Sequence, residues 1–202
     1  MRRILDAIAE LAGRLSGKTF QPLAGPRANA PDDAPLSRNF LSFSIPVPGV
    51  LSRSGQPTEY EFFWLKEHGW KSVINLRGGV GHKEDADDAK LPGFDALGFK
   101  YLRIQMTDAD APTDGQADHF LSFMRDTANH PAHLHCNKGI SRTGVLTAVY
   151  RYSMQGWPMG RAIREAALFG GLTRVQKLWL REWAARHKPG EYAAVPEPAD
   201  EA

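Results

Sequence analysis

Residues 132–155 of the chain read AHLHCNKGISRTGVLTAVYRYSMQ, and this stretch decides the fold. Its first four residues predict a short buried strand that is entered from a turn. Apolar residues recur at helical spacing from residue 143 to 155 and predict a helix. Residues 135–144 therefore lie where a strand ends and a helix begins. In an open α/β sheet, ligands bind at this kind of junction.

The junction carries the one cysteine of the chain, Cys136, six residues before Arg142. Backbone N–H groups of residues 137–142 can converge on one anion, aided by the positive end of the helix dipole. The same field and nearby cations favour the thiolate, which is the nucleophilic form of cysteine. The planar guanidinium of Arg142 can hold two phosphoryl oxygens. The pattern predicts a phosphate-binding loop that carries a nucleophile.

The neighbours of these two residues have expected roles as well. A hydroxyl from Thr143 or Ser141 can hydrogen-bond the sulfur and ease its departure, and His135 is expected to orient the loop through its ring. Gly139 lets the backbone curl without a steric penalty. The predicted phosphate-binding residues are Asn137, Lys138, Gly139, Ile140, Ser141 and Arg142.

The spacing His-Cys, five residues, Arg, Thr resembles the signature loop of the cysteine-dependent protein tyrosine phosphatase superfamily. Its Arg-Thr-Gly ending and Gly-Ile-Ser middle resemble the dual-specificity branch. Residues 51–57 (LSRSGQP) and 73–77 (VINLR) are similar to compact bacterial dual-specificity-like phosphatases, and to atypical plant and fungal ones that act on inositol pyrophosphates. The resemblance spans about residues 45–188 and implies a phosphatase with an α/β fold.

Expelling an alkoxide or phenoxide requires a general acid, which the Cys–Arg loop lacks. Three acids follow a predicted strand at residues 99–105, in a turn-rich loop. In the family, the acid precedes a Pro-Ser/Thr pair that opens the next helix. Asp108, four residues before Pro112, fits this pattern best. Asp110 is the alternative, whereas Asp114 belongs to the first turn of the next helix.

Composition limits the remaining possibilities. The 202 residues are 42% hydrophobic and 24% charged, with a net charge of +2, which gives no case for nucleic-acid binding by bulk electrostatics. A single cysteine excludes an internal disulfide and suits a reducing compartment. It also excludes the internal cysteine relay of an arsenate reductase. With no signal peptide and no apolar span in the sequence, we expect a cytoplasmic protein.

The chain divides into three parts. Residues 1–39 are expected to form an amphipathic helix and a proline-rich arm, residues 40–188 the phosphatase domain, and residues 189–202 a disordered acidic tail. The amphipathic helix is expected to pack on protein, since acidic residues on its polar face disfavour the alternative of membrane contact. The domain is expected to be α/β, with a mainly parallel sheet of about four to five strands flanked by helices.

The expected activity is hydrolysis of phosphate monoesters on phosphoproteins, without cofactor or metal. A small polyphosphorylated metabolite, such as an inositol polyphosphate, is an alternative substrate, because four further cations could face the loop beside Lys138. A phosphate-binding module without turnover is a second alternative, although such modules usually lack the Cys or Arg kept here. The four further cations are Arg53, Arg77, His82 and Lys83.

Overall fold

The structure is a computed structural model that describes residues 40–78 and 87–193. The amphipathic helix and arm expected within residues 1–39 lie outside the described residues, as do residues 194–202. His82 and Lys83, two of the cations expected near the loop, also lie outside them. Within the described ranges, no helix combines the length and apolar character that crossing a membrane requires.

A five-stranded sheet forms the middle layer, and its strand order is β1-β2-β5-β3-β4. β1 pairs antiparallel with β2, whereas the β2–β5, β5–β3 and β3–β4 pairs are parallel. This confirms the expected α/β fold with a mainly parallel sheet. The strands are β1 (Ser44–Val47), β2 (Leu51–Ser54), β3 (Ser72–Asn75), β4 (Lys100–Arg103) and β5 (Ala132–His135).

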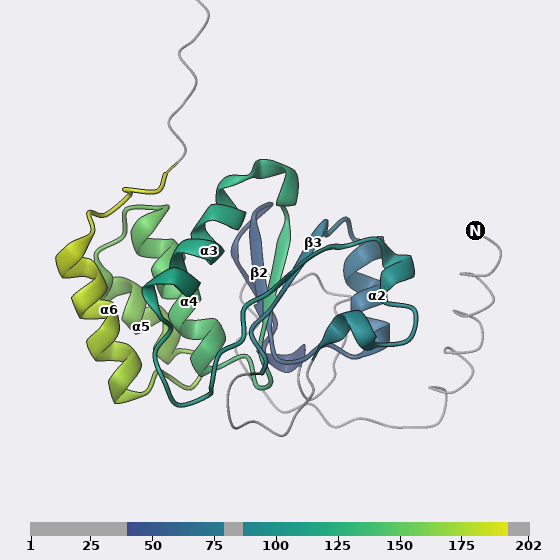
Figure 1. The fold of residues 1–202 in the computed structure, drawn as a ribbon, viewed down its shortest axis with the longest axis horizontal. Helices are drawn as coiled ribbons and strands as arrows, with labels where there is room; N and C mark the ends of the chain where they lie inside the picture. Colours follow the sequence, from purple (N-terminus) through teal and green to yellow (C-terminus); the bar gives the residue numbers. More distant parts are fainter. Residues whose placement is uncertain (1–39, 79–86, 194–202) are drawn as a thin grey trace, which may run out of the picture.

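Helices cover both faces of the sheet (Figure 1). α2 packs on one face together with short 3-10 turns, and the other four helices pack on the opposite face. The helices are α2 (Glu59–Glu67), α3 (Asp114–Arg125), α4 (Ser141–Ser153), α5 (Met159–Ala167) and α6 (Arg174–Arg186). The 3-10 turns are η1 (Phe40–Ser42), η2 (Asp88–Lys90), η3 (Asp95–Leu97) and η4 (Thr127–Asn129).

The two hydrophobic cores follow from the alternation of side chains along each strand. Val73 belongs to the aromatic cluster beneath α2, whereas its neighbour Ile74 belongs to the larger cluster beneath α3–α6. In β5, Leu134 joins the larger cluster, and His133 and His135 lie on the aromatic side, with ring centroids 6.1 Å apart. The sheet therefore buries both faces, as parallel sheets do.

Three helices begin at a capping box, in which a threonine side chain and a residue three positions later exchange hydrogen bonds with each other's backbone. Thr58 caps α2 with Glu61. The boxes at α3 and α6 use Thr113 and Thr173, each with a glutamine as the reciprocal partner. Local sequence therefore fixes where these helices begin.

The carboxyl ends of the four parallel strands meet at one edge of the sheet. His135, the last residue of β5, is in register with Ser54 of β2 and with Asn75 of β3, which is itself in register with Arg103 of β4. The segments that leave β2 and β3 start beside the loop that follows β5, and the segment that leaves β4 starts one strand further away. The topology thus gathers the segments after β2, β3 and β4 around Cys136.

The chain after α6 folds back onto the domain as far as residue 193. The backbone N–H of Tyr192 donates to the Ser153 carbonyl (2.9 Å), and its hydroxyl donates to Asp118 (2.8 Å). The first residues of the segment assigned to the acidic tail therefore pack on α3 and α4. The domain limits themselves stay predictions.

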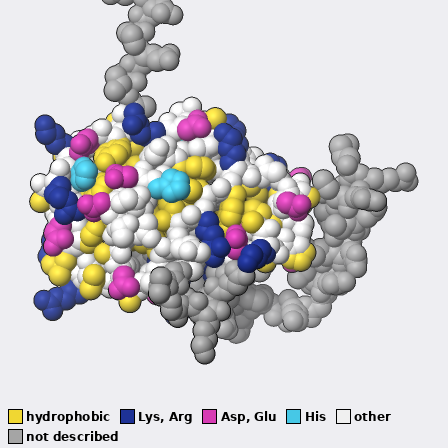
Figure 2. All heavy atoms as spheres, in the orientation of Figure 1, with side chains coloured by type: hydrophobic (Ala, Val, Ile, Leu, Met, Phe, Trp, Pro, Cys, Tyr) yellow, Lys and Arg dark blue, Asp and Glu magenta, His cyan; other side chains and the backbone are white. Residues whose placement is uncertain are grey.

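On the face shown in Figure 2, basic and acidic side chains are interspersed.

Candidate active site

Cys136 lies directly after β5, in the loop that leads into α4. Its side chain is buried, with 2% of the residue exposed, and the backbone N–H of Gly139 donates a hydrogen bond to Sγ (3.2 Å). The positive end of the α4 dipole adds to this field, because α4 begins at Ser141. Both interactions place positive electrostatic potential at the sulfur.

The outward-facing carbonyls of the loop find donors on neighbouring segments. A loop that turns its N–H groups toward an anion turns its carbonyls away from it, and buried carbonyls need partners. The Gly139 carbonyl accepts from Nη2 of Arg53 (2.5 Å), and the Asn137 carbonyl accepts from the Gln56 backbone N–H (2.9 Å). The segment around the end of β2 therefore holds the loop in its anion-binding shape.

Gly139 is the residue whose identity the loop geometry restricts most. Its φ is +69°, and a Cβ built there would lie 2.5 Å from the Gly55 nitrogen and 2.5 Å from the Ser54 carbonyl carbon. Both of these atoms are backbone, so they cannot move aside as a side chain can. The loop passes so close to the end of β2 that no residue with a Cβ fits.

We expect Gly139→Ala to lower the free energy of unfolding by at least about 2 kcal/mol, because a left-handed backbone and a backbone clash both penalise alanine. Urea denaturation followed by circular dichroism measures the change. Gly115→Ala is the matched control, since a Cβ there meets nothing within 4 Å. That variant should be as stable as the wild type or more so. Equal stability of the two alanine variants would contradict the proposed crowding.

Arg53 sits completely buried behind the loop. Its guanidinium stacks on the Phe169 ring at 4.0 Å, and its Nε and Nη1 atoms have no hydrogen-bond partner among the described residues. Burial lowers the pKa of Arg53 to about 10, opposed in part by electrostatic interaction with Cys136 and Glu165. Arg53 therefore stays cationic at neutral pH. The sequence marked Arg53 as a cation that could face substrate, whereas its contacts place it behind the loop.

Arg142 connects the loop to the candidate acid. Its Nη1 donates to the carbonyls of Met106 (3.2 Å) and Leu76 (3.4 Å), and its Nη2 forms an ion pair with Oδ1 of Asp108. The Arg142 side chain is 4% exposed and that of Asp108 is 56% exposed. The arginine is thus fixed from behind, while the carboxylate reaches it from the solvent side.

The other two acids of that segment have different partners. The Asp110 carboxylate accepts from the Thr107 hydroxyl (2.6 Å), and the Asp114 carboxylate pairs with Arg186 (2.9 Å). Asp114 is the first residue of α3, as the sequence predicts. Of the three acids, Asp108 is the one that contacts Arg142.

His135 forms a buried pair with a residue that the sequence analysis missed. Its Nε2 lies 2.8 Å from Oδ2 of Asp88, and the other oxygen of Asp88 accepts from Gln56 Nε2 (2.9 Å). Gln56 also accepts from Nη1 of Arg77 (2.6 Å). Asp88 lies in an acidic stretch that resembles an ordinary surface segment, so no local signal marks it as a partner of His135. Arg77 is likewise engaged with this network.

The remaining residues of the loop differ in exposure. Lys138 is exposed, Asn137, Ile140 and Ser141 are partly exposed, and Thr143 is buried. Oγ1 of Thr143 has no hydrogen-bond partner in the described part of the chain. Among the described residues, the donor to the sulfur is the Gly139 N–H, while the hydroxyl roles expected for Thr143 and Ser141 stay predictions.

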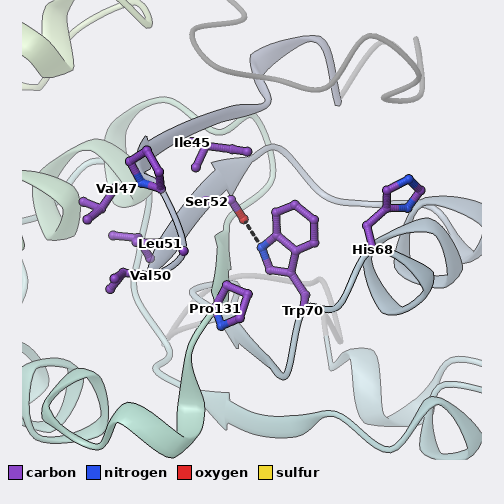
Figure 3. Close-up of a pocket in the computed structure, with 10 residues that line it drawn as sticks. Ile45, Val47, Val50, Leu51, Ser52, His68, Trp70 and Pro131 are labelled. Carbon is purple, nitrogen blue, oxygen red and sulfur yellow. Dashed lines mark hydrogen bonds between the residues drawn. The ribbon is translucent and has the colours of Figure 1, made fainter.

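A separate cavity of about 250 Å³ lies away from this site (Figure 3). Its lining includes Leu51 at the start of β2, Trp70 before β3 and Pro131 before β5, so it lies at the edge of the sheet opposite Cys136. The Trp70 indole N–H donates to Ser52 Oγ there (2.7 Å). This cavity does not belong to the Cys136 site.

The sheet order, and a His-Cys-five-Arg loop between the last strand and a buried helix, define the fold class as that of protein tyrosine phosphatases. Residues 48–176 match the family model described as DSP-PTPase phosphatase fused to NAD+ kinase. The match covers more than half of the chain. The chain therefore belongs to this family of dual-specificity-type phosphatase domains, which confirms the resemblance seen in the signature loop.

Individual relatives support the assignment of the chain to this family. The chain is 30% identical over 129 residues to inositol diphosphatase DSP4 of Arabidopsis thaliana, covering 64% of this chain and 64% of that protein. It is 30% identical over 114 residues to the dual specificity protein phosphatase CDC14A of Homo sapiens, covering 55% of this chain and 18% of that protein. The matched region is less than two thirds of either relative.

A solved structure shares the fold. The core catalytic domain of the PP-IP phosphatase SIW14 from Saccharomyces cerevisiae superposes with a TM-score of 0.59 and 23% sequence identity. The superposition covers 72% of this chain and 91% of that one. At this identity, the likeness concerns the fold.

Proposed function

We propose that the chain hydrolyses phosphate monoesters through a cysteinyl-phosphate intermediate. The thiolate of Cys136 attacks phosphorus, the P–O bond to the leaving group breaks, and Asp108 gives its proton to the leaving oxygen. Water then attacks the phosphocysteine with Asp108 as the base, the P–S bond breaks, and inorganic phosphate leaves. Arg142 holds the phosphoryl oxygens in both steps.

One observation carries this proposal: Arg142, in the first turn of α4, contacts the carboxylate of Asp108, and Cys136 lies buried in the loop that leads into the same helix. Nucleophile, oxyanion clamp and proton donor thus converge at one edge of the sheet. Asp108 is preferred to Asp110 because the carboxylate of Asp110 is held by Thr107, within its own loop. A module that only binds phosphate would not need the acid in this position.

Phosphoproteins are the proposed substrates. A polyphosphorylated substrate requires several cations that are free to bind it, yet Arg53 donates to the Gly139 carbonyl and Arg77 to Gln56. In the described part of the loop, Lys138 is the exposed cation. A small polyphosphorylated metabolite is the second candidate, favoured by the similarity to the Arabidopsis thaliana inositol diphosphatase DSP4.

Because the thiol must stay reduced, we place the protein in the cytoplasm.

Phosphate release from a panel of phosphotyrosine, phosphoserine and phosphothreonine peptides and of inositol phosphates, measured with malachite green, tests the substrate class. We expect kcat/KM on the best phosphopeptide to exceed that on any inositol phosphate by at least about tenfold, which corresponds to about 1.4 kcal/mol in transition-state binding. A higher kcat/KM on an inositol polyphosphate would make the metabolite the substrate and overturn the assignment to phosphoproteins.

A further inference from the structure

The segment that carries Asp108 is held by the first turn of α6. Three successive backbone carbonyls, those of residues 108, 109 and 110, accept hydrogen bonds from two side chains of that helix. Nε2 of Gln176 donates to the carbonyls of Asp108 (3.4 Å) and Asp110 (3.1 Å). The hydroxyl of Thr173 donates to the Ala109 carbonyl (3.0 Å). The exposed turn around Asp108 is therefore tied to a rigid element.

Gln176 is itself fixed in one orientation. It is completely buried, and its Oε1 accepts from the Thr173 backbone N–H (3.1 Å), while its own backbone N–H donates to Thr173 Oγ1 (3.2 Å). Because the capping box occupies the amide oxygen, the amide nitrogen must point at the turn. A buried polar network whose members are all bonded rigidifies the segments that it joins.

These bonds act on the backbone of Asp108, whereas its carboxylate meets Nη2 of Arg142 on the other side. Asp108 is thus held by two contacts. Gln176 of α6 binds its backbone carbonyl, and Arg142 binds its side chain. General acid catalysis depends on the donor being within hydrogen-bond reach of the leaving oxygen. A displacement of about 1 Å can lower the rate about 100-fold.

We propose that Gln176 and Thr173 are positioning residues that hold the Asp108 turn at the distance where its carboxyl protonates the leaving group. This inference rests on the proposed role of Asp108 as general acid. Neither side chain is assigned a contact with substrate, so their effect must pass through Asp108. We call the three hydrogen bonds from Gln176 and Thr173 to this turn the latch. They are needed because the turn itself is exposed to solvent and makes few hydrogen bonds of its own.

The test is Gln176→Met, which keeps a side chain of similar length and removes the amide donor. We expect kcat/KM on phenyl phosphate, whose leaving group is poor, to fall by about tenfold, with kcat/KM on p-nitrophenyl phosphate within about twofold of the wild type. This ratio reports the steps up to departure of the leaving group and excludes hydrolysis of the phosphocysteine, which is the same for both esters. Thr173→Val should show the same selective loss, and Thr173→Ser should restore the rate on phenyl phosphate.

Gln116→Met is the matched control. Gln116 forms the equivalent capping box with Thr113 at the start of α3, but its amide nitrogen donates to the Gln105 carbonyl (2.7 Å), outside the turn that carries Asp108. This variant loses the same helix cap and should keep the wild-type ratio of the two rates. A melting temperature measured for each variant separates loss of stability from loss of positioning.

The outcomes separate the two proposals. If Gln176→Met lowers kcat/KM equally on both esters, or behaves like Gln116→Met, the latch is wrong and Gln176 serves stability alone. If Asp108→Asn itself hydrolyses phenyl phosphate as fast as the wild type, the assignment of the general acid is wrong, and the latch is wrong with it. A selective loss in Asp108→Asn without one in Gln176→Met overturns the latch and leaves the proposed reaction standing.

Discussion

Cys136→Ser is expected to abolish turnover, with kcat on p-nitrophenyl phosphate at least about 10⁴-fold lower than in the wild type. The loop stabilises an anion at this position through the Gly139 N–H and the α4 dipole, and a serine hydroxyl does not ionise there at neutral pH. Steady-state release of p-nitrophenolate measures the loss.

Binding of tungstate, measured by calorimetry, provides the control for this variant. The loop N–H groups and Arg142 are retained, so Cys136→Ser should still bind the oxyanion. Loss of both turnover and binding would indicate a collapsed loop. Turnover within about tenfold of the wild type would refute the role of Cys136 as the nucleophile.

Asp108→Asn is expected to give the second large loss of activity, with kcat about 10²–10⁴-fold lower than in the wild type. An amide has the shape of the carboxyl group but no proton to give, so the loss should be larger for phenyl phosphate than for p-nitrophenyl phosphate. A comparison of kcat for the two esters measures this difference directly.

Asp110→Asn serves as the matched control, because this residue lies in the same turn and its carboxylate is bonded to Thr107. It should retain kcat within about twofold on both esters. If Asp110→Asn shows the leaving-group dependence and Asp108→Asn does not, the two acids must be exchanged in the proposed reaction.

The two central residues of the candidate site could be proposed from the sequence because the chemistry proposed for them requires a local pattern. Cys136 and Arg142 must project from one short loop, so their spacing along the chain is fixed. The acid was narrowed to Asp108 or Asp110, since both lie in one turn at similar distance from the next helix. The family pattern before Pro112 favoured Asp108, and the partners of the two acids, Arg142 and Thr107, support the same choice.

Residues that act through distant partners were missed or given another role. Asp88 pairs with His135 across 47 positions, and Gln176 reaches Asp108 across 68. Gln176 could be expected as part of a helix cap, but the direction of its amide nitrogen depends on where the β4–α3 connection passes. Arg53 was marked as a cation near the loop, yet its bond to the Gly139 carbonyl follows from the pairing of β2 with β5.

The sequence by itself determined the strand-loop-helix unit around Cys136, the helix starts at their capping boxes and the α/β class, because these depend on residues within a few positions of one another. Tertiary structure alone decided what surrounds the unit. The parallel register brings the ends of β2, β3 and β4 to the same edge of the sheet as the end of β5, and the buried carbonyls and side chains gathered there must each find a partner. Those partners lie far away in the chain, so a short-range sequence pattern cannot predict them.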